Sequence, residues 1–121
     1  MNYKHIVAYC SGPAAAVASA IITASVRERL AASVNRTAAL RSTYLWQGKV
    51  CDRAPVLRTI KTQASRHQAL EARIRALHPD ALPEIIATRI VAGPTDCLDR
   101  VTRECAGTAD GAPDSDGARS A

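Results

Sequence analysis

The feature that most constrains this chain is a long strand-like stretch over residues 34–62. Two segments rich in strand-forming residues, 34–46 and 49–62, flank a Gln47-Gly48 turn. At about 3.3 Å per residue each arm reaches about 35–40 Å, whereas most strands have about five or six residues. A ribbon of this length overhangs any single core that 121 residues can build, and its free edges favour pairing with another molecule. We therefore expect an oligomer that is joined through the ribbon.

Length and charge limit the class of protein. A chain of 121 residues is expected to form one domain, and with one Trp, three Tyr and no Phe its core must be aliphatic. The formal net charge is +5, with −2 on residues 106–121 and +7 spread over residues 1–105. The basic residues form no patch with interleaved aromatics, so we expect no nucleic-acid partner. No apolar run has the length needed to span a bilayer, so we expect no membrane partner.

The cysteines indicate a reducing compartment. Their spacing contains no CxxC pair and no zinc-type pattern. Residues 16–20 mimic a signal-peptidase site, but the apolar run over residues 6–10 is too short for a signal peptide and Ser11-Gly12-Pro13 interrupts it. We therefore expect a cytoplasmic protein. The four cysteines are Cys10, Cys51, Cys97 and Cys105.

The remaining pattern predicts an α+β fold. Strands are expected at residues 3–10 and 84–91, and helices at 14–32, 65–78 and 95–105, with Ser65 and Gln68 forming a capping box. Right-handed crossovers turn this order into a ferredoxin-like βαββαβ sandwich with strand order 4-1-3-2, a long hairpin and an extra C-terminal helix. Two helices would cover one face of the sheet, and association would cover the other. Residues 1–105 are then a single domain and residues 106–121 a disordered tail.

This topology brings Cys10 and His78 to the same end of the sheet. Cys10 ends the first strand and His78 ends the second helix, and the turn at residues 46–49, Cys51 and Glu84 share that end. Thiolate and imidazole together favour copper or zinc over magnesium or calcium. The alternative is structural: Cys10 is then a small buried apolar residue, and His78 only caps a helix C-terminus.

Four stretches of the chain resemble the CutA divalent-cation-tolerance family. The resemblance extends over about residues 4–105 and implies a tight trimer of ferredoxin-like subunits, similar to the PII signalling proteins, with ribbons pairing across subunits. It also implies binding of copper(II) or another divalent metal that is not required for folding, a role in metal tolerance, and no enzymatic reaction. The stretches are residues 28–35 (ERLAASVN), 42–49 (STYLWQGK), 60–62 (IKT) and 78–86 (HPDALPEII).

The resemblance also implies site residues. Bacterial members bind copper through a Cys that ends the first strand and a His-His pair before Pro; Cys10 and His78 match, but Leu77 stands where the first His would be. Clefts between family subunits are lined by the turn aromatics, the Lys of K-T and the Glu of P-E. In this chain the Lys would come from a neighbouring subunit, because within its own subunit it falls at the end of the sheet opposite to the turn. The residues expected in these clefts are Tyr44, Trp46, Lys49, Lys61 and Glu84.

Departures from the family pattern keep other functions open. The acidic residues that usually follow the turn are replaced by Cys51, Arg53 and Pro55, and Pro55 is expected at a strand edge or bulge. The lost carboxylates make a trimeric cleft more positive, which favours an alternative: a PII-like sensing or scaffolding trimer that binds a small anionic ligand or a partner protein. An enzyme with Cys10 or Cys51 as nucleophile is a third hypothesis. No histidine with an orienting residue stands near either thiol in the pattern, so we expect no catalysis.

Overall fold

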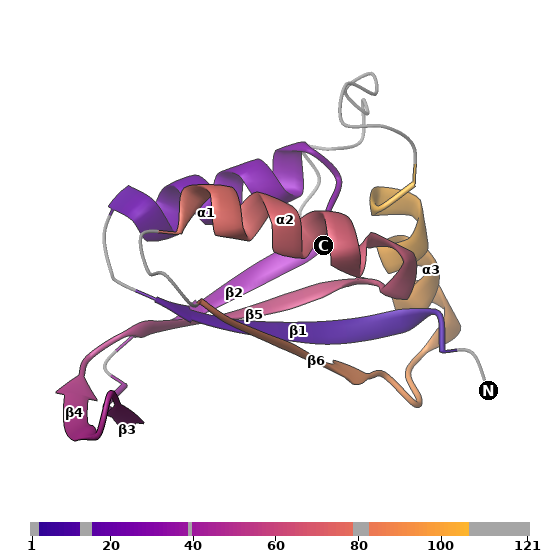
Figure 1. The fold of residues 1–121 in the computed structure, drawn as a ribbon. Coiled ribbons are helices and arrows are strands. Elements are labelled where there is room, and N and C mark those ends of the chain that lie inside the picture. The colour runs from indigo at the N-terminus through magenta and orange to yellow at the C-terminus, as the bar shows by residue number, and fades with distance from the viewer. Residues whose placement is uncertain (1–2, 13–15, 39, 79–82, 107–121) are drawn as a thin grey trace.

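The computed structural model of the protein describes residues 3–12, 16–38, 40–78 and 83–106. Two helices, α1 and α2, lie side by side on one face of an antiparallel sheet, and α3 stands at one end of that sheet (Figure 1). The elements in chain order are β1 (His5–Gly12), α1 (Ala16–Arg27), β2 (Ser33–Thr37), β3 (Ser42–Trp46), β4 (Lys49–Arg53), β5 (Val56–Gln63), the 3₁₀ turn η1 (Ala64–Arg66), α2 (His67–Leu77), β6 (Glu84–Arg89) and α3 (Thr95–Glu104).

The strand order confirms the predicted fold class. The main sheet has the order β2-β5-β1-β6 with antiparallel pairing throughout, and β3 and β4 form a separate two-stranded sheet. When each arm of the ribbon is counted as one strand, this is the ferredoxin-like order 4-1-3-2. Among the described elements, no helix lies over the face of the main sheet opposite α1 and α2 (Figure 1). We call it the open face; its residues are Val7, Tyr9, Ser11, Ser33, Asn35, Thr37, Leu57, Thr59, Lys61, Glu84, Ile86 and Thr88.

Alternation along β1 and β5 builds the core. Every second residue from Ile6 to Gly12 is buried, and so is every second residue from Val56 to Thr62. Successive side chains of a strand point to opposite faces, so these residues face the helices. The cluster is aliphatic, as the scarcity of aromatics predicted. Its members are Ala8, Cys10, Ile21, Leu30, Ala31, Ile60, Leu70 and Ile74.

The long ribbon exists, but each arm is broken once. The expected strand over residues 34–46 is divided into β2 and β3, and the one over residues 49–62 into β4 and β5. Pro55 lies in the second break, where its missing N–H cannot contribute to a ladder. The β3–β4 hairpin therefore lies beyond the end of the main sheet rather than in it (Figure 1).

The turn of the hairpin is as predicted. Gln47 and Gly48 have φ angles of 51° and 80°, which is typical of a type I′ turn, and Trp46 pairs with Lys49 across it. Gly48 adopts the positive φ without the steric cost of a Cβ.

The first helix is shorter than predicted. α1 ends at Arg27 instead of residue 32, because Arg29 takes a left-handed φ of 58°. The N–H groups of Leu30 and Ala31 then bond back to the Ser25 carbonyl, which closes the helix end.

The predicted capping box of Ser65 and Gln68 is wrong. Helix α2 begins only at His67, whose N–H group already donates to the Ala64 carbonyl of the 3₁₀ turn η1. The N-cap residue of α2 makes no side-chain hydrogen bond. The other end is as predicted: His78 caps α2, and its N–H donates to the Ile74 carbonyl at 2.8 Å.

Smaller differences concern the ends of strands. β1 runs two residues further than predicted, because Ser11 and Gly12 still pair with β5, and β6 ends at Arg89 instead of residue 91. α3 agrees with its prediction to within one residue. The disordered tail was predicted over residues 106–121, of which residues 107–121 lie outside the described residues. In the described part of the chain, no helix combines the length and apolar character needed to cross a membrane.

Replacing Ile74 by alanine tests the core. Ile74 is fully buried between α2 and the sheet, so Ile74→Ala should lower the unfolding free energy by about 2–5 kcal/mol through lost burial and a residual cavity. The control is Val26→Ala on the exposed side of α1, where Val26 is 43% exposed and the change should stay within about 0.5 kcal/mol. Chemical denaturation measures both, and equal losses would contradict this core.

Candidate functional site

Cys10 and His78, the predicted metal-ligating pair, lie next to the same backbone group. Cys10 points from β1 to the helix-covered face and is fully buried, and His78 at the end of α2 is 7% exposed. The Cys10 Sγ lies 3.8 Å from the Ser11 carbonyl oxygen, and the His78 Nε2 lies 3.1 Å from the same oxygen. The structure thus brings together the two donors that the topology had placed at this end.

A third residue, Arg58, belongs to the same group and was not among the predicted site residues. The β1–β5 register sets Arg58 opposite Cys10, and its Nη1 lies 3.8 Å from the Cys10 Sγ. The Arg58 side chain is fully buried, a position that arginine almost never takes unless it is paired. The signal was present in the alternation of β5: a strand that buries Val56, Ile60 and Thr62 must also bury Arg58.

Gly12 makes room for this group. A Cβ at this position would lie 2.5 Å from the His78 Nε2 and 3.1 Å from the Arg58 Nη1. The imidazole and the guanidinium therefore both pack against the Gly12 backbone, and any side chain here must displace them.

The hydrogen bonds define which atoms carry protons. A carbonyl oxygen only accepts, so the His78 Nε2 carries the hydrogen that it donates to Ser11. The Cys10 thiol donates to the same oxygen, and the Cys10 sulfur accepts from the Arg58 Nη1, because a guanidinium only donates. The Cys10 sulfur and the His78 Nε2 are thus already hydrogen-bonded within the chain.

The donor types fit a metal ion. Thiol and imidazole are the ligands that copper and zinc prefer. In residues 3–12, 16–38, 40–78 and 83–106, however, no three His, Cys, Asp or Glu side chains are grouped so that they could hold an ion. Cys51, which the topology placed at the same end as this pair, lies on the hairpin, where its Sγ is 3.7 Å from the Lys49 carbonyl oxygen. A metal at Cys10 and His78 therefore needs further ligands from water or from another molecule.

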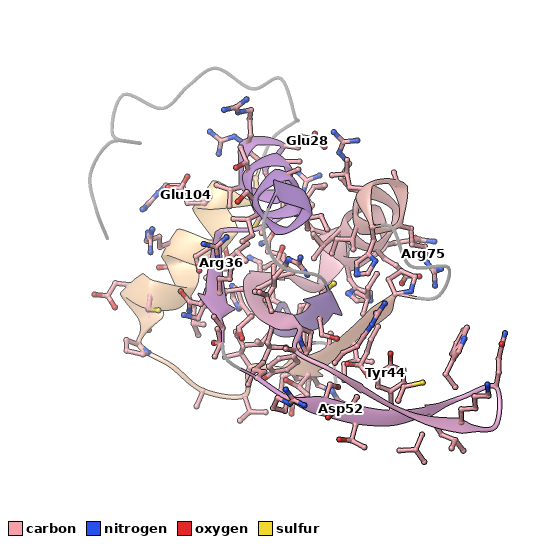
Figure 2. The ribbon with its side chains drawn as sticks, turned by 90° about the vertical axis from the view of Figure 1, so that its left-hand side faces the viewer. Glu28, Arg36, Tyr44, Asp52, Arg75 and Glu104 are labelled. Carbon is pink, nitrogen blue, oxygen red and sulfur yellow. The ribbon has the colours of Figure 1, made fainter. Side chains whose placement is uncertain are left out.

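Three of the predicted cleft residues share one face of the hairpin. Tyr44 lies opposite Cys51 and Trp46 lies opposite Lys49, so Tyr44, Trp46 and Lys49 point the same way. Figure 2 shows Tyr44 on this hairpin, away from the helices.

The other two, Lys61 and Glu84, lie on the open face. Lys61 pairs with Val7 and Glu84 pairs with Ser11, which is four residues further along β1. This separates the two side chains by about 13 Å along the strand direction. Lys61 thus lies at the end of the main sheet opposite to Glu84, as predicted. A single chain therefore does not assemble the five residues into one cleft.

This chain is similar to known proteins in both sequence and structure. A family model described as CutA1 divalent ion tolerance protein matches residues 6–104. The chain is 42% identical over 87 residues to the divalent-cation tolerance protein CutA of Thermus thermophilus, covering 72% of this chain and 84% of that protein. It is 40% identical over 86 residues to protein CutA of Mus musculus, which covers 71% of this chain and 49% of that protein. The chain thus spans about half the length of the mouse relative.

The fold agrees with a solved structure. The crystal structure of CutA from Xylella fastidiosa superposes with a TM-score of 0.83 and 34% sequence identity, over 85% of this chain and 99% of that chain.

A methyl group at Gly12 tests the packing at the end of β1. Gly12→Ala should lower the unfolding free energy by about 1–3 kcal/mol, because the added Cβ overlaps two buried side chains. Gly93→Ala is the matched control, since a Cβ there comes no closer than 3.6 Å to its neighbours. Urea denaturation compares the two; a Gly12→Ala protein as stable as Gly93→Ala would contradict the packing described here.

Proposed function

The chain belongs to the CutA1 family of divalent ion tolerance proteins, as four stretches of its sequence predicted, and we propose that it acts without enzymatic activity, as a homotrimer, in the response to and tolerance of divalent metal ions. The observation that carries this proposal is the family match over residues 6–104, which includes nearly every described element. The name of the Thermus relative states divalent-cation tolerance, and we extend that role to this chain.

The open face supports association of copies. Val7, Tyr9 and Leu57 are half-buried there, and Ile86 is 57% exposed although it is a large apolar side chain. A sheet face of this kind is normally covered by another layer. We propose that the open faces of three copies supply this layer for one another.

The hairpin supports the same assembly. Leu45 and Val50 lie opposite each other on one of its faces and are 70% and 76% exposed, and Trp46 on the other face is 45% exposed. An isolated two-stranded hairpin is only marginally stable in water, and its free edges favour pairing. We propose that the hairpins pair across copies and that Tyr44, Trp46 and Lys49 then line clefts together with Lys61 and Glu84.

We propose that copper, or another divalent metal ion, contacts the chain at Cys10 and His78. Their chemistry and their shared position beside the Ser11 carbonyl support this contact. The metal is not needed for folding in this proposal, because an aliphatic cluster forms the core.

An anionic ligand in the clefts between copies remains a prediction. Arg58, the buried cation, is on the helix-covered face and so does not face such a cleft. The open face itself carries charges of both signs at Lys61 and Glu84. These positions give an anion no particular support.

We propose the cytoplasm as the compartment. All four cysteines are free thiols in the structure, and Cys97 is exposed. A reducing compartment keeps such thiols free.

Mass and interface substitution test the trimer. At micromolar concentration, light scattering should give about three times the chain mass of 12.8 kDa. Ile86→Arg on the open face should shift the protein to lower mass, because three buried charges would face one another. Val26→Arg on α1 is the control and should leave the mass unchanged; a wild-type monomer, or a trimer indifferent to Ile86→Arg, would overturn the proposed assembly.

Copper titration tests the metal contact. Equilibrium dialysis should show at least about tenfold weaker copper binding for Cys10→Ala/His78→Ala than for the wild type, equivalent to about 1.4 kcal/mol. The control Cys51→Ala/His67→Ala removes the same residue types from less buried positions and should bind like the wild type. Equal, weak binding by the wild type and the Cys10/His78 variant would remove this contact.

A further inference from the structure

We infer that Arg58 sets how tightly the Cys10–His78 pair binds a metal ion: its guanidinium lies against the Cys10 sulfur and lowers the affinity of the pair for divalent cations, and removing the guanidinium raises that affinity. This inference rests on the proposed metal contact and adds to it the residue that sets affinity. It follows from three observations on the atoms around the pair.

The first observation is that the Arg58 guanidinium engages the sulfur itself. Its Nη1 is 3.8 Å from the Cys10 Sγ, and both side chains are fully buried. A guanidinium is always protonated in proteins and cannot be discharged to make way for a cation. A metal that takes the sulfur must therefore move the arginine.

The second observation is that His78 has turned its Nε2 to the backbone. This nitrogen carries the hydrogen donated to the Ser11 carbonyl at 3.1 Å, so it offers no lone pair to a metal. The ring is held there by burial and by the close fit against Gly12, where Arg58 also packs. The imidazole and the guanidinium thus pack against the same stretch of backbone.

The third observation is that Arg58 places a positively charged group beside the sulfur. A copper or zinc ion bound by the sulfur would lie about 2.3 Å from it, within a few ångströms of a guanidinium nitrogen. A divalent ion and a unit positive charge at such a distance repel strongly in a protein interior.

The test compares metal affinity with and without the guanidinium. All proteins carry Cys51→Ser and Cys97→Ser, so that Cys10 and the buried Cys105 are the remaining thiols. Anaerobic titration with Co²⁺ follows the thiolate-to-cobalt charge-transfer band, and Zn²⁺ competition gives the affinity; neither ion oxidises thiols. Arg58→Met keeps an unbranched side chain but no charge, and it should bind at least about 100-fold tighter than the protein with Arg58.

Two controls assign the effect. Arg58→Met/Cys10→Ser should lose the charge-transfer band, which identifies the sulfur. Arg73→Met removes an arginine that pairs with Glu28 on the helix surface at 2.9 Å, and it should bind like the protein with Arg58.

The outcomes separate this inference from the proposed metal contact. A band that depends on Cys10 and is equally strong and tight with and without Arg58 would overturn the role of Arg58 and leave the metal contact standing. No band that depends on Cys10 in either protein would overturn both. Thermal unfolding checks that Arg58→Met folds; if it does not, Arg58→Gln, which is neutral but polar, takes its place with the same expected direction.

Discussion

The pairing of β1 with β5 and β6 is the constraint on which the rest of this structure depends. β1 is central, and its antiparallel register sets Cys10 opposite Arg58 on one side and Ile85 on the other. A shift by one residue would move every side chain of β1 to the other face. The same register therefore decides the aliphatic core, the position of the thiol, and the burial of an arginine beside it.

Much of this arrangement could be predicted from the sequence. The order of elements and the right-handedness of crossovers were enough for the strand order, and the strand and helix ends placed Cys10 and His78 together. The family resemblance rested on short stretches whose spacing is specific, and the match over residues 6–104 agrees with it.

Other features could not be read from local pattern alone. Whether Pro55 breaks the strand depends on whether a neighbouring strand would bond to an N–H group at that position. The residues around Ser65 also fit a capping box in sequence, but the structure has a 3₁₀ turn there instead. Arg58 is a different case, because its burial follows from the alternation in β5 once it is known which face of that strand is buried. A charged residue in a buried register is unfavourable unless it is paired, so it is a useful signal for a site.

The surfaces of the proposed assembly and the proposed metal contact lie on opposite faces of the main sheet. The surfaces proposed to join copies are the open face and the hairpin, whereas Cys10, Arg58 and His78 are on the side of the sheet covered by α1 and α2. In the proposed assembly the donor pair would therefore stay inside each subunit. The two parts meet only at the end of β1, where Ser11 pairs with Glu84 on the open face and accepts from Cys10 and His78 through its carbonyl.

The proposed metal contact depends most directly on the state of two atoms at the end of β1, the Cys10 sulfur and the His78 Nε2, which are hydrogen-bonded within the chain. Nitrogen-15 NMR of the His78 ring in the metal-free protein tests this statement. The hydrogen bond to Ser11 predicts a protonated Nε2 that exchanges slowly with water, because His78 is 7% exposed. An unprotonated Nε2 would contradict it, since that nitrogen would then be free to bind a metal without rearrangement.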